Sequence, residues 1–221
     1  YMLVVVGMGY TRQAVALGFA LVGLTALGKA QVRSFIFLVA VGATFHKSAV
    51  LLLPIAALAA SRNRLLTGFL VVLTTALLYY LLLADASEAL WKNYVEAEYQ
   101  SQGGLIRVLM NVVPAGLLIV FRKRLVPDPQ ERKLWLWIAV FSLACLPLVG
   151  LASTAVDRVA LYLIPIQLFV FSRVPRLART VRGRTPLVLG VVAYYAAVMF
   201  IWLNFAVHAE YWLPYQFMPL W

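Results

Sequence analysis

Residues 34–60 read SFIFLVAVGATFHKSAVLLLPIAALAA, two apolar runs separated by a polar break at residues 44–48. A helix that crosses a membrane needs about 20 apolar residues, because it rises about 1.5 Å per residue through about 30 Å of hydrocarbon. Each run would span only about 18–20 Å as a helix, so neither crosses alone. We therefore expect a short re-entrant hairpin at about residues 34–60, with its apex at residues 45–48. The alternative is one long, tilted helix.

The whole chain has the composition of a polytopic membrane protein. Its 221 residues are 64% hydrophobic and 12% charged, whereas a soluble domain carries about 25% charged residues. The sequence thus predicts an all-α, integral membrane fold in a single transmembrane domain, residues 1–221. Because it starts at Tyr1 without an initiator methionine, we expect the C-terminal part of a longer chain. The candidate spans are residues 9–28, 65–83, 105–121, 134–152, 158–172 and 186–206.

The charges of the loops predict which ends of these segments share a side. Residues 122–133 and 173–185 form short basic loops, which are typical of the cytoplasmic side. Residues 84–104 are mainly acidic and should form an external loop. Arg62 and Arg64 lie on the cytoplasmic side only if residues 34–60 enter the membrane from that side and return to it. The positive charges therefore favour the hairpin. All but five of the 19 basic residues then lie at cytoplasmic ends.

The five remaining cations are Arg12, Lys47, Lys92, Arg107 and Arg158. Charged groups at membrane depth usually face a protein interior or a water-filled cavity and mark functional sites. Arg12-Gln13 opens an apolar helix, where the helix dipole disfavours a cation, so we expect an anion from elsewhere to face Arg12. The alternative is an arginine that extends to lipid headgroups. Lys92 lies among carboxylates and is expected to be a solvated partner.

His46-Lys47 lies at the predicted apex of the hairpin. A histidine there can serve as a general base or donate a hydrogen bond to a phosphate, with Lys47 as a further contact for an anion. The alternative is a buried histidine bonded to the backbone, beside a lysine that extends to the interface.

Asp157-Arg158 lies between two apolar segments. Arg158 could bind a phosphate with two parallel hydrogen bonds, with Asp157 orienting it. The alternative is a local salt bridge at the start of a helix, with Asp157 as its N-cap. Arg107, one turn into its helix, could reach the same vestibule or extend to the interface.

The predicted external loop mixes aromatic residues with Glu96 and Glu98. This combination suits carbohydrate, because sugars stack on aromatic rings and bond to carboxylates. The alternative is an amphipathic helix in the aromatic belt of the membrane interface.

Other chemistry has little support in the sequence. Most of the charges behind the net charge of +11 cluster in short loops between apolar segments, which argues against nucleic acid as a partner. No Walker A, G-x-G-x-x-G, H-E-x-x-H or C-x-x-C motif is present. Two histidines and one cysteine, far apart in sequence, offer little for a metal site.

Three elements in order resemble one family. They are Arg12-Gln13 at the start of an apolar helix, Phe45-His46-Lys47-Ser48-Ala49 with Pro54 downstream, and Asp157-Arg158 followed by Tyr162. This pattern is similar to the EpsG family of Wzy-like polymerases of exopolysaccharide, capsule and O-antigen repeat units. The resemblance implies a GT-C-like helical fold and a glycosyltransferase that needs neither metal nor cofactor.

The resemblance also implies a substrate and a place for the reaction. The enzyme would transfer a growing glycan from undecaprenyl diphosphate to an acceptor sugar hydroxyl on a second lipid-linked oligosaccharide. The site would face the periplasm or exterior of the bacterial inner (plasma) membrane, with a chain-length regulator and a flippase as candidate partners. We expect catalytic roles for His46, Arg12 and Arg158, and substrate-binding roles for Gln13, Lys47, Arg107, Asp157, Tyr162, Glu96 and Glu98. His46 is the first candidate for the base that takes the proton of the acceptor hydroxyl, and an acidic residue of 84–104 is the second.

Three other functions would use similar residues. The first is a ligase or another glycosyltransferase acting on lipid-linked glycans. The second is a transporter or flippase of an anionic lipid-linked substrate, for which discontinuous helices in two matching places would be typical. The third is a membrane acyltransferase with His46 as its base.

Overall fold

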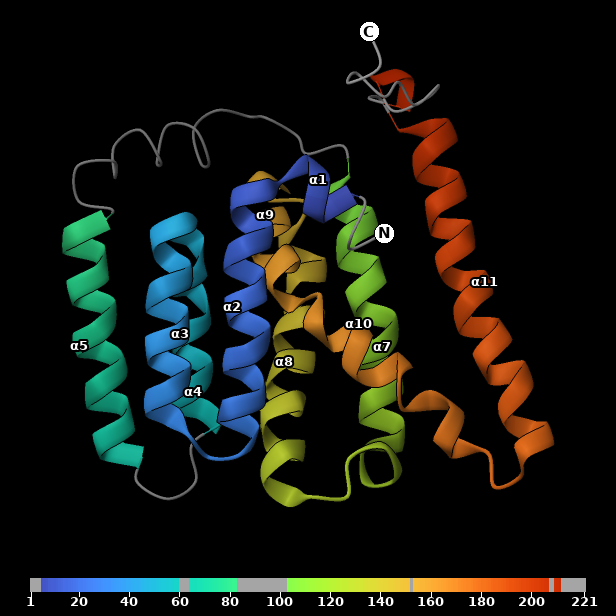
Figure 1. The fold of residues 1–221 in the computed structure, drawn as a ribbon, viewed down its shortest axis with the longest axis horizontal. Coiled ribbons are helices and arrows are strands. Elements are labelled where there is room, and N and C mark those ends of the chain that lie inside the picture. Colours follow the sequence, from blue (N-terminus) through green and yellow to red (C-terminus); the bar gives the residue numbers. More distant parts are fainter. Residues whose placement is uncertain (1–4, 60–63, 83–102, 152, 207–208, 212–221) are drawn as a thin grey trace, which may run out of the picture.

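A computed structural model of the chain describes residues 5–59, 64–82, 103–151, 153–206 and 209–211, and it forms a bundle of helices (Figure 1). These described residues contain no β-strand, so the predicted all-α membrane fold is confirmed. The elements are α1 (Gly7–Gly9), α2 (Thr11–Gly28), α3 (Val32–Phe45), η2 (Lys47–Leu52), α4 (Leu53–Ala59), α5 (Arg64–Leu82), α7 (Gly104–Leu125), α8 (Pro129–Leu148), α9 (Ser153–Leu163), α10 (Pro165–Phe171), η5 (Val174–Leu177), α11 (Val181–Phe205) and η6 (Ala209–Tyr211).

The helices run between two ends of the bundle that differ in charge. The turns between α2 and α3, between α7 and α8, and between η5 and α11 lie together at the bottom of Figure 1. We call this the basic end, because it holds the basic segments 29–33, 122–133 and 173–184. The opposite end, called the site end, holds the starts of α2, α7 and α9 and the last turn of α3.

The hairpin predicted for residues 34–60 is present. Helix α3 rises to the site end, stops at Phe45, and the chain returns through η2 and α4 to the basic end (Figure 1). The reversal occurs at His46, whose extended backbone (φ −148°, ψ 111°) cannot continue a helix. Pro54 stands in the first turn of α4, where its missing N–H leaves no bond unmade. The alternative of one long helix is wrong.

Small residues let α2 and α3 approach each other closely. A methyl group added at Gly42 would lie 3.2 Å from the carbonyl oxygen of Ala16, so the two backbones are nearly in contact there. Gly23 has the same role lower in the pair, with the ring of Phe35 3.2 Å from its missing Cβ. Association through small residues is usual between helices in lipid, where the hydrophobic effect does not drive it. This packing fixes α3, and hence the apex at His46, against the start of α2.

The predicted span 158–172 is a broken element in the structure. Helix α9 and the segment from Pro165 to Leu177 meet at an angle of 41°. Pro165 has no N–H, and the N–H of Ile164 bonds to Leu161 at 3.4 Å instead of continuing the α-helical pattern. The carbonyl oxygen of Ala160 accepts a bond from Asn111 Nδ2 at 2.7 Å. Because the break is satisfied by a side chain of α7, it is a specified feature of the bundle.

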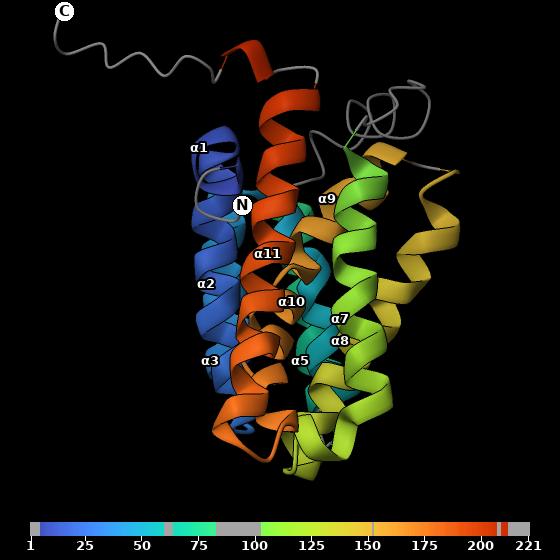
Figure 2. The same cartoon turned by 90° about the vertical axis from the view of Figure 1, so that its right-hand side faces the viewer.

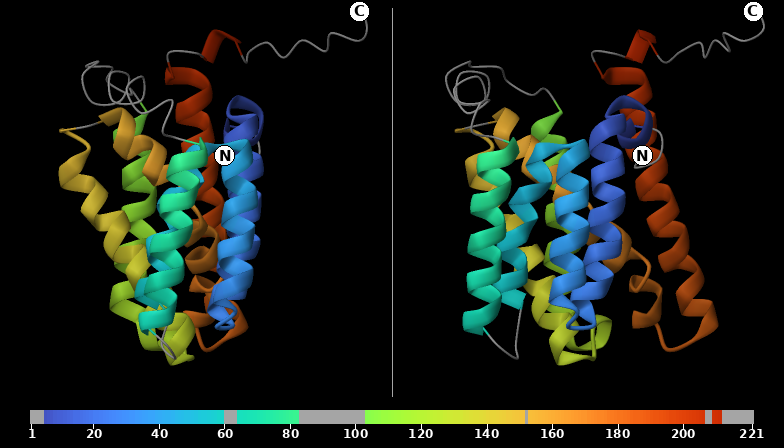
Figure 3. Two further views of the ribbon diagram at one scale, coloured as in Figure 1. Left: turned by 90° about the vertical axis from the view of Figure 1, so that its left-hand side faces the viewer. Right: turned by 60° about the vertical axis from the view of Figure 1, so that its left-hand side comes forward.

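Three described helices are long and apolar enough to cross a membrane: α2, α7 and α11; the bent pair would make four. Helix α11 differs from the others because none of its residues is buried. It stands apart in Figure 1, and Figures 2 and 3 show it beside the bundle with η5 joining it at the basic end. Its main ring contacts join Tyr194 and Tyr195 to Phe171 of α10, at 5.3 and 5.7 Å between centroids.

Candidate functional site

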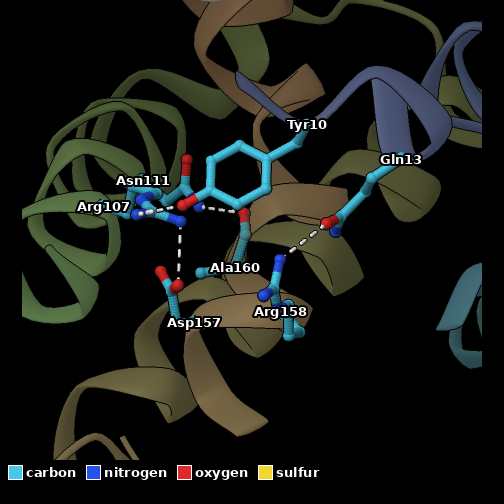
Figure 4. A network of polar contacts seen from close by, with 7 residues as sticks. All are labelled: Tyr10, Gln13, Arg107, Asn111, Asp157, Arg158 and Ala160. Carbon is cyan, nitrogen blue, oxygen red and sulfur yellow. Dashed lines mark hydrogen bonds and ion pairs between the residues drawn. The ribbon is translucent and has the colours of Figure 1, made fainter. Parts of the chain in front are cut away.

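Arg107 and Asp157 form a buried ion pair at the site end. The guanidinium of Arg107, from the first turn of α7, donates to Asp157 Oδ2 on α9 at 2.8 Å (Figure 4). The two side chains are 10% and 5% exposed, so little water screens the pair. This contact joins two helices whose residues are 50 positions apart in the sequence.

Asp157 therefore does not have the role that its neighbour in sequence suggested. Its recorded ion pair is with Arg107, whereas we expected it to orient Arg158. Asp157 also lies inside α9, so the alternative of an N-cap is wrong. Consecutive residues of a helix point about 100° apart, which is why Asp157 faces α7 while Arg158 faces α2.

Arg158 has no carboxylate partner among the described residues. Its NH1 donates to Gln13 Oε1 of α2 at 3.3 Å, and its guanidinium carbon lies 5.2 Å from the centre of the Tyr10 ring (Figure 4). Its Nε is buried and, within the described ranges, has no hydrogen-bond acceptor. The charge of Arg158 is thus held in place by neutral groups, an arrangement that suits a bound anion.

Gln13, on the facing helix α2, also has a buried donor without an acceptor among the described residues. The side chain is 2% exposed, and its Nε2 also lacks an acceptor in the described part of the chain. Since buried polar groups in folded proteins are nearly always hydrogen-bonded, such donors call for an explanation. Two neighbouring buried donors, one on a cation, have the chemistry of a site for a phosphate oxygen.

His46 lies close to this cluster and is held through one ring nitrogen. Its Nδ1 is 2.6 Å from Ser48 Oγ and 3.2 Å from the hydroxyl of Tyr162 on α9. It sits in the break between α3 and η2, outside the spanning helices. Burial lowers the pKa of His46 below its ordinary value of 6.5, and the positive charge of Arg158 lowers it further. The imidazole is therefore neutral at pH 7, and its Nε2 has no recorded contact within the described residues.

A chain of buried amides supports α9 from below. Asn111 donates to Ala160 and accepts from Gln167 Nε2 at 2.7 Å, and Gln167 Oε1 accepts from the hydroxyl of Tyr195 at 3.1 Å. The chain joins α7, α9, α10 and α11. It fixes the position of α9, and with it Asp157 and Arg158.

The other predicted site residues differ in where the structure places them. Arg12 and Lys47 are exposed at the site end, and no hydrogen bond or ion pair is recorded for either within the described ranges. Arg107 and Tyr162 are brought to the cluster, as expected. Glu96, Glu98 and Lys92 lie outside the described residues, so the predicted carbohydrate contacts of residues 84–104 stay predictions.

Sequence reasoning missed four residues of this region. Ser48 was named only beside His46 in the sequence motif, and Tyr10, Asn111 and Gln167 were not considered. Asn111 and Gln167 did carry a signal, because a lone amide in an apolar segment needs a partner. For the other two, only the three-dimensional arrangement reveals the role.

Among the described residues, neither a metal-ligand cluster nor the recorded cavity competes with this site. In the described part of the chain, no three His, Cys, Asp or Glu side chains gather as metal ligands would. A shallow cavity of about 360 Å³ lies on α8 towards the basic end and contains none of the candidate residues. Its lining is Pro129, Arg132, Lys133, Leu136, Trp137 and Val140.

The fold and the site together define a polytopic helical membrane protein with a cluster of polar and charged side chains around Arg158, and with His46, at one end. A model of the EpsG family matches residues 1–217, nearly the whole chain, and the protein belongs to that family. No curated protein and no solved structure matches the chain. Membership of the EpsG family indicates a general role in polysaccharide polymerisation.

Proposed function

We propose that this protein polymerises lipid-linked oligosaccharide repeat units into surface polysaccharide. The growing glycan leaves an undecaprenyl diphosphate carrier and is transferred to a sugar hydroxyl of a second lipid-linked unit. The observation that carries the proposal is that the half-buried Arg158 has no carboxylate partner among the described residues, together with the buried, unused donors Arg158 Nε and Gln13 Nε2. Membership of the EpsG family supports the reaction class.

The reaction places charge where these residues lie. The bond between the sugar C1 and the diphosphate oxygen breaks, and its electron pair leaves with the diphosphate. A new bond forms between C1 and the acceptor oxygen. Arg158 and Gln13 donate to the oxygens of the leaving diphosphate, where negative charge grows in the transition state. Removing one such fixed donor typically slows an enzyme about 10²–10³-fold.

The acceptor hydroxyl must lose a proton, and His46 is the residue proposed to take it. As a base, His46 uses Nε2, and its Nδ1–H then donates to the hydroxyl oxygens of Ser48 and Tyr162. This is the logic of a base held by an orienting group on its other nitrogen. The lowered pKa of His46 favours the neutral form that this step needs.

The side on which the reaction occurs follows from the charges of the two ends. Most basic residues of the chain lie at the basic end, which we assign to the cytoplasm. The site end then faces the periplasm or exterior of the plasma membrane. Exposed Arg12 and Lys47 would meet the substrate there, and Arg107 with Asp157 would hold the wall of the site.

A second candidate function is transport of an anionic lipid-linked substrate. The observation in its favour is that helices are interrupted at His46 and at Pro165 in the described part of the chain. Discontinuous helices are common in transporters. The EpsG family favours the polymerase. The two functions can be distinguished because a polymerase lengthens the glycan, whereas a transporter moves the substrate across the membrane unchanged.

The test uses the purified protein in vesicles with lipid-diphosphate-linked repeat units and no energy source. The proposal predicts a ladder of longer glycans, because the diphosphate linkage itself supplies the driving force. A matched reaction with denatured protein should leave single units. Movement of repeat units across the vesicle bilayer without any longer product would contradict the proposal and support transport.

A further inference from the structure

Tyr10 lies between the two arginines of the site end, where neither composition nor motif had marked it. It ends α1 and precedes α2 with a non-helical backbone (φ −132°, ψ 54°), which turns its side chain toward α7 and α9 (Figure 4). The guanidinium carbons of Arg107 and Arg158 lie 5.5 and 5.2 Å from the centre of its ring. One aromatic ring therefore contacts both cations.

The hydroxyl of Tyr10 accepts a bond from Arg107 NH2 at 3.5 Å, which is at the long limit for a hydrogen bond. Its own hydrogen has no recorded acceptor among the described residues. Arg158 Nε and Gln13 Nε2 lack acceptors in the same part of the chain. Within the described residues, two buried donors thus lack acceptors, and the half-buried Tyr10 hydroxyl lies in the same cluster (Figure 4).

We propose that Tyr10 is a phosphate-binding residue whose hydroxyl donates to an oxygen of the diphosphate, alongside Arg158 and Gln13. A diphosphate has enough oxygens for all three donors. The contact from Arg107 polarises the Tyr10 hydroxyl and makes it a better donor. The identity of the ligand as a diphosphate rests on the proposed function, whereas the deficit of acceptors rests on the contacts alone.

The neutral ring also explains how the two arginines can lie close together when the described residues place one carboxylate, Asp157, beside them. Asp157 compensates Arg107, and the negative face of the Tyr10 ring attracts the guanidinium of Arg158. A ligand that brings negative charge completes the arrangement. Removing the ring should therefore harm ligand binding more than removing the hydroxyl.

The experiment measures binding of a short polyprenyl diphosphate, its monophosphate and inorganic pyrophosphate to the protein in nanodiscs, without acceptor. Tyr10→Phe removes the hydroxyl and keeps the ring; Tyr10→Ala removes both. Tyr80→Phe is the matched control, because Tyr80 is 75% exposed on α5. We expect Tyr10→Phe to weaken diphosphate binding about tenfold, the usual effect of losing a hydrogen bond to a charged group. Tyr10→Ala should weaken it more, and Tyr80→Phe should not change it.

Equal diphosphate affinity of Tyr10→Phe and the unchanged protein would overturn the inference, because a purely structural ring survives that substitution. Pyrophosphate binding that shows the same dependence on Tyr10 places the contact at the phosphates, not the lipid. If Tyr10→Phe weakens binding but the protein elongates no glycan, the Tyr10 assignment holds and the polymerase proposal fails. If the protein elongates glycans and Tyr10→Phe binds normally, the reverse is true.

Discussion

The Arg107–Asp157 pair gives the sharpest prediction about stability. Asp157→Asn removes one charge of a pair whose side chains are only 10% and 5% exposed, with 2.8 Å between the charged atoms. The buried guanidinium of Arg107 then loses the carboxylate of its recorded ion pair. Breaking a buried pair in this way typically costs about 3–5 kcal/mol. We therefore expect Asp157→Asn to lower the free energy of unfolding by about that amount.

The chain offers its own control for this prediction. Arg173 and Glu131 form an ion pair at the basic end, with 3.2 Å between their charged atoms and side chains 24% and 32% exposed. Because water screens this pair more, Glu131→Gln should cost only about 0–1 kcal/mol. The double variant Arg107→Gln, Asp157→Asn should regain much of the lost stability, since no charge stays buried alone.

The assay is equilibrium unfolding in mixed detergent micelles, followed by circular dichroism, for the unchanged protein, the single variants Arg107→Gln, Asp157→Asn and Glu131→Gln, and the double variant. The interaction free energy follows from the cycle of Arg107 and Asp157 substitutions. A loss for Asp157→Asn no larger than that for Glu131→Gln would refute the reasoning, because burial would then add nothing. So would a double variant that is less stable than either single one.

Three further outcomes follow from the structure. Elongation should be steady above pH 6.5 and fall only as the pH drops through the lowered pKa of His46, because protonation removes the base; activity that stays constant down to the lowest pH at which the protein is folded would exclude that role. Gly42→Leu should cost about 1–3 kcal/mol of stability, since even its first carbon meets the Ala16 carbonyl oxygen at 3.2 Å, and an unchanged unfolding curve would contradict the close packing. Single cysteines at Lys47 and Lys123 should be labelled by an impermeant thiol reagent from opposite sides of the membrane, and labelling of both from one side would show that the ends are misassigned.

The hairpin could be predicted because length and charge both bear on it. Neither apolar run beside His46-Lys47 is long enough to cross a membrane, which leaves few possible arrangements in lipid. The basic residues at their ends favour one of these, the hairpin. The same reasoning placed Arg12, His46 and Arg158 at one end. These are properties of segments, which a single sequence displays.

The partners within the site could not be predicted in this way. Arg107 pairs with a carboxylate 50 positions away, and the choice depends on how α7 and α9 are rotated about their axes. Reading Asp157 with its neighbour Arg158 gave the wrong partner for that reason. Pro165 offered a signal for a break in the segment 158–172 that the span prediction did not use, and only Asn111, which satisfies the freed carbonyl, shows why the break is tolerated.

The central claim is that Arg158 stabilises the charge of a leaving lipid diphosphate during glycan transfer. The most direct measurement is the single-turnover rate of elongation by the unchanged protein and by Arg158→Gln, at saturating lipid-linked repeat unit. Arg182→Gln is the matched control, an exposed arginine at the basic end. We expect a rate about 10²–10³-fold lower for Arg158→Gln and an unchanged rate for the control. Equal rates for all three proteins would contradict it.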